Sequence, residues 1–131
     1  MGLTRIAAAA VAVGALAGLG GVILGAYAAH GAAPELRPGL ETAALYALIH
    51  GLALMAAALI YDRTKDGRLA RWIIALSMLA FALGTLFFSG SIFLAALGHY
   101  PSTAPMGGVL LMAGWAGLVV AALAILLRRR R

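Results

Sequence analysis

A histidine lies where an apolar segment is expected to cross the middle of a membrane. His50 stands nine residues after Glu41, which precedes a long charge-free stretch, and this places it about 13 Å along a helix. An imidazole at that depth can exchange a proton, bind a ligand or form a hydrogen bond between helices. Because ionisable side chains within a bilayer are rare and face a bundle interior or a cavity, His50 is the first candidate for a functional residue.

A small set of polar side chains is expected near His50. Tyr46 precedes it by four residues and shares its helix face, while Thr85 and Ser89 lie at matching depths of a later apolar segment. We predict a polar pocket that opens to the outer side of the membrane, with the candidate ligand-binding residues His30, Tyr46, His50, Ser89 and Ser91. The alternative is structural: a neutral His50 hydrogen-bonds across helices, and each serine bonds to a carbonyl one turn back.

Metal and cofactor chemistry is not indicated by the residue types. The chain has no cysteine, which excludes thiol catalysis and cysteine-bound zinc or iron–sulfur clusters. It has no HExxH motif, and its glycine-rich stretch lies inside an apolar segment instead of after a strand. We therefore assign no metal, no cofactor and no catalytic residue. A membrane enzyme with His50 or His30 as general base is kept as an alternative.

The composition requires a bilayer as solvent for the elements that position these residues. Of 131 residues, 64% are hydrophobic and 11% charged, against about 45–50% and about 25% in soluble domains. The charge-free stretches, and a break at Gly98–Pro105 with a glycine and two prolines, predict one membrane domain, residues 1–131, with spans near 6–29, 42–61, 72–97 and 106–127. These segments do not alternate as barrel strands do, so the predicted fold class is an all-α integral membrane protein, a bundle of four transmembrane helices.

The charges predict the orientation. One side of the membrane carries Arg5, Arg63, Lys65, Arg68, Arg71 and Arg128–Arg131, and the other carries Arg37 alone. By the positive-inside rule both termini are cytoplasmic, in the cell (inner) membrane. The net charge of +6 does not indicate nucleic acid, because the basic residues flank apolar segments. A cleaved signal peptide is disfavoured, since the first apolar run is about twice the usual length of a signal core.

A glycine stripe marks the first span. Gly14, Gly18, Gly21 and Gly25 follow one another at steps of four, three and four, so they share one helix face. Small residues at such spacing let two helices approach closely in lipid. We favour packing against a neighbouring helix of the same chain over a seam between two copies.

Four segments resemble the domain of unknown function 423 family, the YgdD-like small membrane proteins. They are Gly25–Gly31 (GAYAAHG), Thr42–Leu54 (TAALYALIHGLAL), Phe88–Ser91 (FSGS), and Ala104–Gly108 (APMGG) with Gly114-Trp115. The resemblance covers essentially the whole chain. It implies a four-helix inner-membrane protein of no established activity whose motif residues are His30, Tyr46, His50, Ser89 and Ser91. The chain departs from the family at Ala47, where glutamine is frequent, and at Gly51, where alanine is usual.

Three functions are therefore open. The leading hypothesis is a non-enzymatic membrane protein that binds or passes a small ligand or lipid through the polar pocket. Its partners would be the lipid bilayer and, for transport, further copies in a homo-oligomer. The second is an accessory subunit that packs into a larger membrane complex through the glycine stripe. The third is the small enzyme. A cavity large enough for a ligand would favour the first, and a sealed, fully hydrogen-bonded interior the second.

Overall fold

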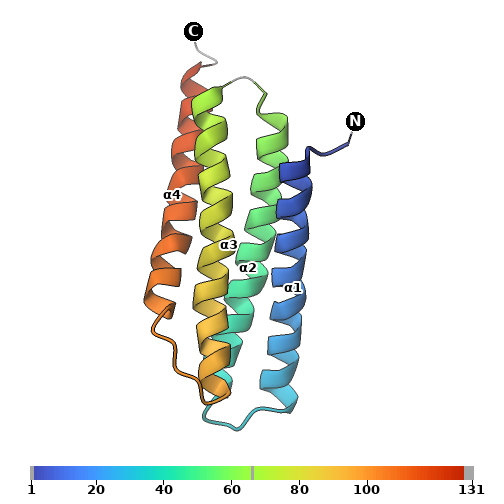
Figure 1. Ribbon diagram of the computed structural model, residues 1–131, viewed down its shortest axis with the longest axis vertical. Coiled ribbons are helices and arrows are strands. Elements are labelled where there is room, and N and C mark those ends of the chain that lie inside the picture. Colours follow the sequence, from blue (N-terminus) through green and yellow to red (C-terminus); the bar gives the residue numbers. More distant parts are fainter. Residues whose placement is uncertain (1, 66, 129–131) are drawn as a thin grey trace.

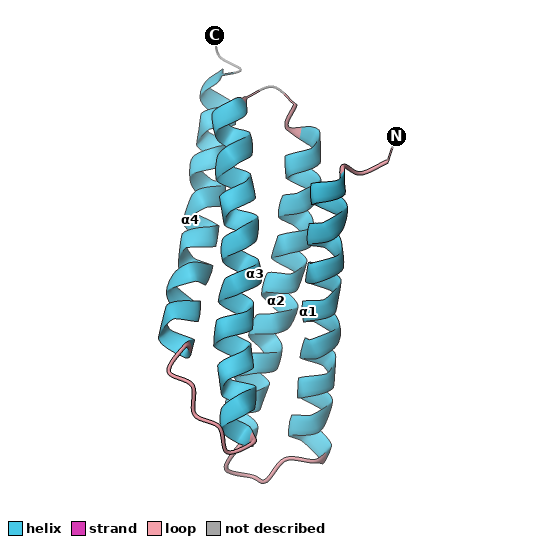
Figure 2. Ribbon diagram, in the orientation of Figure 1, coloured by secondary structure: helices cyan, strands magenta, loops and turns pink. Residues whose placement is uncertain are grey.

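The computed structural model describes residues 2–65 and 67–128, and within them the chain forms four long helices joined by short loops (Figure 2). They are α1 Arg5–His30, α2 Arg37–Arg63, α3 Arg68–Ala96 and α4 Ala104–Arg128. Each is long and apolar enough to cross a membrane. The predicted fold class, an all-α bundle of four such helices, is confirmed, and each predicted span falls largely within one helix.

The helix ends follow from local chemistry. The Thr4 hydroxyl accepts a hydrogen bond from the Ala7 backbone N–H at 3.3 Å and caps the start of α1. At the other end of α1, the Gly31 N–H donates to the Tyr27 carbonyl at 2.8 Å. Gly98 adopts a φ of +84° between α3 and α4, a left-handed conformation that favours glycine, and Pro105 lies in the first turn of α4. The apolar run therefore breaks where the sequence indicated.

The helices run up and down, and both described ends lie at the same end of the bundle (Figure 1). α1 packs along α2, α2 along α3, and α3 along α4. The central pair α2 and α3 is the more buried, whereas only 17% of the apolar window of α1 and of α4 is buried. The large core side chains Phe81, Ile74 and Leu40 come from α2 and α3. The cytoplasmic placement of the termini stays a prediction of the positive-inside rule.

Glycines bring α1 against the backbone of α2. A Cβ added to Gly14 would lie 2.7 Å from the Gly51 carbonyl oxygen, and one added to Gly21 would lie 2.9 Å from that of Ala44. Gly25 has only an ordinary contact at this seam, and the Cβ position of Gly18 is open. Gly14 and Gly21 thus bring α1 close to a helix of the same chain.

A second glycine seam joins α3 to α4. A Cβ on Gly84 would lie 3.0 Å from the Gly107 carbonyl oxygen, and one on Gly114 would meet the Phe81 ring at 2.7 Å. This seam was not predicted. Its signal in the sequence is the seven-residue step from Gly107 to Gly114, which returns to one helix face after two turns. The bundle is therefore two glycine-packed helical hairpins, joined where α2 meets α3.

Candidate functional site

His50 lies in the interior of the bundle, within a group of aromatic rings from three helices. Its side chain is buried, and its ring centroid is 5.3 Å from that of Tyr46 on α2, 5.9 Å from Phe81 on α3 and 6.1 Å from Trp115 on α4. Phe81 and Trp115 meet edge to face at 5.2 Å, a favourable arrangement for aromatic pairs. Packing from three helices therefore fixes the imidazole in place.

One nitrogen of the His50 ring is engaged and the other is not. Nδ1 donates to the Tyr46 carbonyl oxygen, one turn earlier on α2, at 2.8 Å. Because a carbonyl only accepts, the proton of a neutral imidazole sits on Nδ1 and leaves Nε2 as an acceptor. The described residues offer Nε2 no hydrogen-bond partner. The ring can therefore accept one more hydrogen bond.

A groove of about 820 Å3 runs between α1 and α3, with α2 as its base, and is called the α1–α3 groove below. On α1 it extends from Val13 to Tyr27, toward the C-terminal end of that helix. Most of its walls are aliphatic or aromatic. The polar side chains that line it are His50, Thr85 and Ser89, with Tyr27 at the far end. A volume in the range of about 300–1,000 Å3 is typical of ligand sites.

Thr85 lines this groove and carries a buried hydroxyl that is unsatisfied. Its side chain is 8% exposed, and among the described residues its Oγ1 has no hydrogen-bond partner. Ser89, one turn further along α3, is satisfied, since its Oγ donates to the Ala43 carbonyl of α2 at 2.8 Å. Leaving a buried hydroxyl unpaired costs about 1–3 kcal/mol. Nε2 of His50 and the covered Thr85 hydroxyl are therefore two groups beside the groove that lack a second or any hydrogen bond.

The five predicted pocket residues do not gather in one place. His50 and Ser89 line the α1–α3 groove. Tyr46 stacks on Phe88 at 4.5 Å, and Ser91 donates to the Phe88 carbonyl of its own helix at 3.0 Å. His30 is exposed at the last residue of α1. The groove is therefore more apolar than the predicted pocket, and the binding roles of the five residues stay predictions.

Two features of the groove were not found in the sequence. Gly20 and Gly90 line it from opposite walls, and neither would bring a Cβ into close contact, so their missing side chains help to keep the groove open. Thr85 was matched to His50 by depth, but its lack of a partner depends on how the helices pack. Among the described residues, no group of three or more His, Cys, Asp or Glu side chains could hold a metal ion.

The fold and the site define a small multi-pass α-helical membrane protein with a groove beside a buried histidine. Residues 24–108 match the family model described as "Protein of unknown function (DUF423)", and the chain belongs to this family. The resemblance seen in the sequence motifs is thereby confirmed.

Several relatives match about four fifths or more of the chain. A membrane protein of Staphylococcus epidermidis, named UPF0382, is 34% identical over 121 residues, which are 86% of this chain and 93% of the relative. A UPF0382 membrane protein of Haemophilus influenzae is 36% identical over 79% of this chain and 85% of its own. The UPF0382 inner membrane protein YgdD of Escherichia coli is 34% identical over 83% of this chain and 85% of the relative. No solved structure matches. The protein is thus a multi-pass inner-membrane protein in contact with the lipid bilayer, as predicted.

Proposed function

We propose that the protein binds the apolar chain of a lipid or lipid-like molecule in the α1–α3 groove and carries out no chemical step on it. The observation that carries this proposal is a groove of about 820 Å3 with mostly aliphatic or aromatic walls, beside which His50 and the unpartnered Thr85 hydroxyl lie. A groove lined by hydrocarbon in a bilayer accepts any acyl chain. Selectivity must therefore come from the few polar groups, which gain most from a hydrogen bond where water is absent.

The free hydrogen-bonding groups suggest which polar group the ligand carries. Thr85 Oγ1 is covered and reaches a ligand only when its side chain rotates, and it can then donate or accept, whereas Nε2 of neutral His50 accepts only. A hydroxyl on the ligand can form a hydrogen bond with either group, and a carbonyl can accept from Thr85. The proposed ligand is therefore an apolar chain with a hydroxyl or carbonyl at the depth of His50.

The rival functions have less support. An accessory subunit would be favoured by a sealed and fully hydrogen-bonded interior, whereas the α1–α3 groove holds about 820 Å3 of space and an unpaired hydroxyl. An enzyme with His50 as general base usually needs a second group to orient or relay the proton. Among the described residues that line the groove there is no carboxylate.

The test is native mass spectrometry of the protein released from mild detergent, with two matched glycine variants. Gly20 lines the groove and Gly18 does not, yet both lie on α1 and both have open Cβ positions. We expect a reproducible adduct on the wild type and on Gly18→Phe, and its loss in Gly20→Phe, because the ring fills the groove. An adduct that survives in Gly20→Phe would refute this site. The mass of the adduct identifies the ligand.

Recognition of the polar group is tested separately. His50→Ala and Thr85→Val each remove one hydrogen-bonding group from the groove, and Thr85→Val keeps the shape of the side chain. We expect each to weaken adduct formation several-fold, in line with the loss of one hydrogen bond of about 1 kcal/mol. If both variants keep the adduct unchanged, the groove holds apolar chains without regard to polarity.

A further inference from the structure

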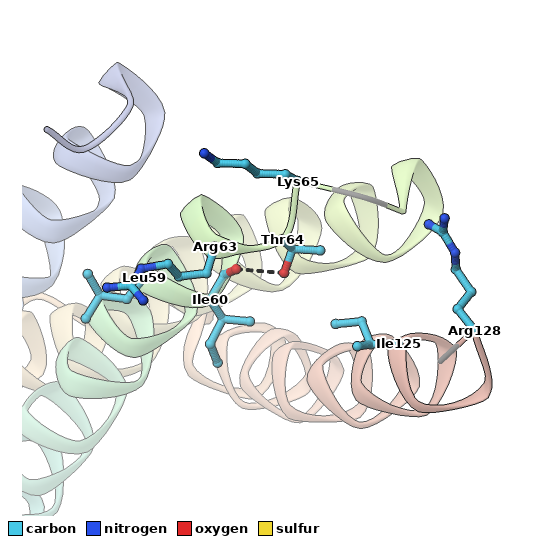
Figure 3. Close-up of a pocket in the computed structure, with 7 residues that line it drawn as sticks. All are labelled: Leu59, Ile60, Arg63, Thr64, Lys65, Ile125 and Arg128. Carbon is cyan, nitrogen blue, oxygen red and sulfur yellow. Dashed lines mark hydrogen bonds between the residues drawn. The ribbon is translucent and has the colours of Figure 1, made fainter. Parts of the chain in front are cut away.

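A second groove lies at the opposite end of the bundle, between the end of α2 and the end of α4 (Figure 3). It is called the α2–α4 groove here and has a volume of about 850 Å3. Its lining consists of Leu59, Ile60, Arg63, Thr64, Lys65, Ile125 and Arg128. Three aliphatic and three cationic side chains therefore share one depression, at the end of the bundle where α1 begins and α4 ends.

The apolar and basic groups of this groove are separated by depth. Leu59, Ile60 and Ile125 lie nearer the middle of their helices, whereas Arg63, Lys65 and Arg128 lie at or beyond the helix ends. Figure 3 shows Ile125 between Ile60 and Arg128. The polarity thus changes along the membrane normal in the same order as in a phospholipid, from hydrocarbon to headgroup.

The cations come from two elements that meet at the same end. The Arg128 guanidinium lies so near the start of α3 that a Cβ on Gly67 would approach its Nη1 to 2.8 Å. Arg71 is occupied elsewhere, since it donates to the Thr64 carbonyl at 3.3 Å and stacks over the Tyr61 ring at 4.2 Å. It therefore steadies the turn after α2, while Arg63, Lys65 and Arg128 line the groove with their charged ends pointing in different directions (Figure 3).

Among the described residues, Asp62 is the acidic group near this groove, and its charge partly offsets that of Lys65. Asp62 accepts a hydrogen bond from the Thr4 backbone N–H at 3.0 Å, on the side of α1. Asp66 lies outside the described residues. The Thr64 hydroxyl donates to the Ile60 carbonyl at 2.7 Å, which leaves its oxygen as an acceptor only. The donors that line the groove are therefore the side chains of Arg63, Lys65 and Arg128.

We propose that the α2–α4 groove is a binding site for an anionic phospholipid. Arg63, Lys65 and Arg128 hold the phosphate of the headgroup, and one acyl chain lies along Leu59, Ile60 and Ile125. Arginine suits this role because its planar fork binds phosphate oxygens in pairs. Basic pockets between transmembrane helices on the cytoplasmic side bind such headgroups, and the positive-inside rule predicts that side here. The site is independent of the ligand proposed for the α1–α3 groove.

The test compares two double variants with the same loss of charge. Arg63→Gln/Arg128→Gln removes two cations of the groove, and Arg5→Gln/Arg68→Gln removes two exposed cations at the same end that do not line it. Binding of phosphatidylglycerol and phosphatidylcholine is titrated by native mass spectrometry. One basic residue near an anionic surface contributes roughly fivefold in affinity. We therefore expect the groove variant to lose phosphatidylglycerol binding on the order of twentyfold, and the control variant to stay within about twofold.

Three results would overturn the proposal. These are equal losses in the two double variants, equal binding of phosphatidylcholine by the wild type, and displacement of the lipid by millimolar inorganic phosphate, which would make this a site for soluble phosphate. Circular dichroism checks that each variant is folded. If Arg63→Gln/Arg128→Gln does not fold, Lys65→Gln, a single change at an exposed residue, is measured instead and should lose about fivefold by the same reasoning.

Discussion

The two grooves differ in the position of their polar groups and hardly at all in volume, about 820 Å3 for the α1–α3 groove and about 850 Å3 for the α2–α4 groove. In the first, His50 and Thr85 lie deep among hydrocarbon side chains. In the second, the hydrocarbon is deep and the cations lie at the helix ends. In a bilayer, depth decides which part of a lipid a site meets, so the proposed ligand of the first groove is recognised within its chain and that of the second by its headgroup.

The largest effect is expected from a change that separates the walls of the first groove and leaves the second intact. A Cβ on Gly51 would lie 2.7 Å from the Gly14 carbonyl oxygen, so Gly51→Leu must push α1 away from α2. Overpacking of this kind costs about 3 kcal/mol, and we expect a large fall in melting temperature in detergent and loss of the adduct. Gly18→Leu, at an open position, is the control. A melting temperature for Gly51→Leu equal to that of the wild type would show that α1 and α2 are not in close contact at Gly51.

Ionic strength should distinguish the two grooves without any substitution. Between 0.1 and 1 M salt the screening length falls from about 10 Å to about 3 Å. We expect phosphatidylglycerol binding at the α2–α4 groove to weaken about tenfold, because its cations lie at the surface, whereas the chain in the α1–α3 groove should be unaffected. Titration with a fluorescent phosphatidylglycerol measures binding at the α2–α4 groove. The amount of ligand that copurifies after a high-salt wash measures binding at the α1–α3 groove. Equal salt sensitivity of the two grooves would contradict the proposed difference between a charged surface site and an apolar interior site.

Two hydroxyls of α3 should respond with opposite sign. Thr85→Val removes an unpaired buried hydroxyl, and we expect the ligand-free protein to gain about 1 kcal/mol in stability. Ser89→Ala removes the hydrogen bond to the Ala43 carbonyl, and we expect a loss of about 0.6 kcal/mol. Equilibrium unfolding in mixed micelles measures both. A destabilised Thr85→Val would show that its hydroxyl is satisfied in the membrane.

The smallest effects are expected at two residues that the sequence placed in the pocket. His30 is exposed at the end of α1, and Ser91 bonds to its own helix. We expect His30→Ala and Ser91→Ala to leave the adduct unchanged and to alter stability by less than about 0.5 kcal/mol, as is usual for substitutions away from packed or paired groups. Loss of the adduct in either variant, measured by native mass spectrometry, would restore the polar pocket as it was predicted.

The sequence alone determined the number of helices, the break at Gly98–Pro105 and the apolar class of the protein. The physical reason is that a bilayer offers no partner for the backbone, so each segment must satisfy its own hydrogen bonds as a helix. Helical spacing also placed Gly14 and Gly21 on one face. Counting residues along each span placed His50, Thr85 and Ser89 at similar depths, because each helix crosses the same thickness of the bilayer.

Only the tertiary structure decided which of these residues meet. The rotation and lateral position of each helix depend on side-chain packing across the seams, for which hydropathy carries no signal. Packing turned His50, Thr85 and Ser89 toward the α1–α3 groove, and left His30, Tyr46 and Ser91 outside its lining. It also left Thr85 without a partner while Ser89 reached the Ala43 carbonyl. The composition of the sequence does not show which hydroxyl lacks a hydrogen-bond partner. The unpaired hydroxyl of Thr85 is therefore found only once the helices are placed side by side.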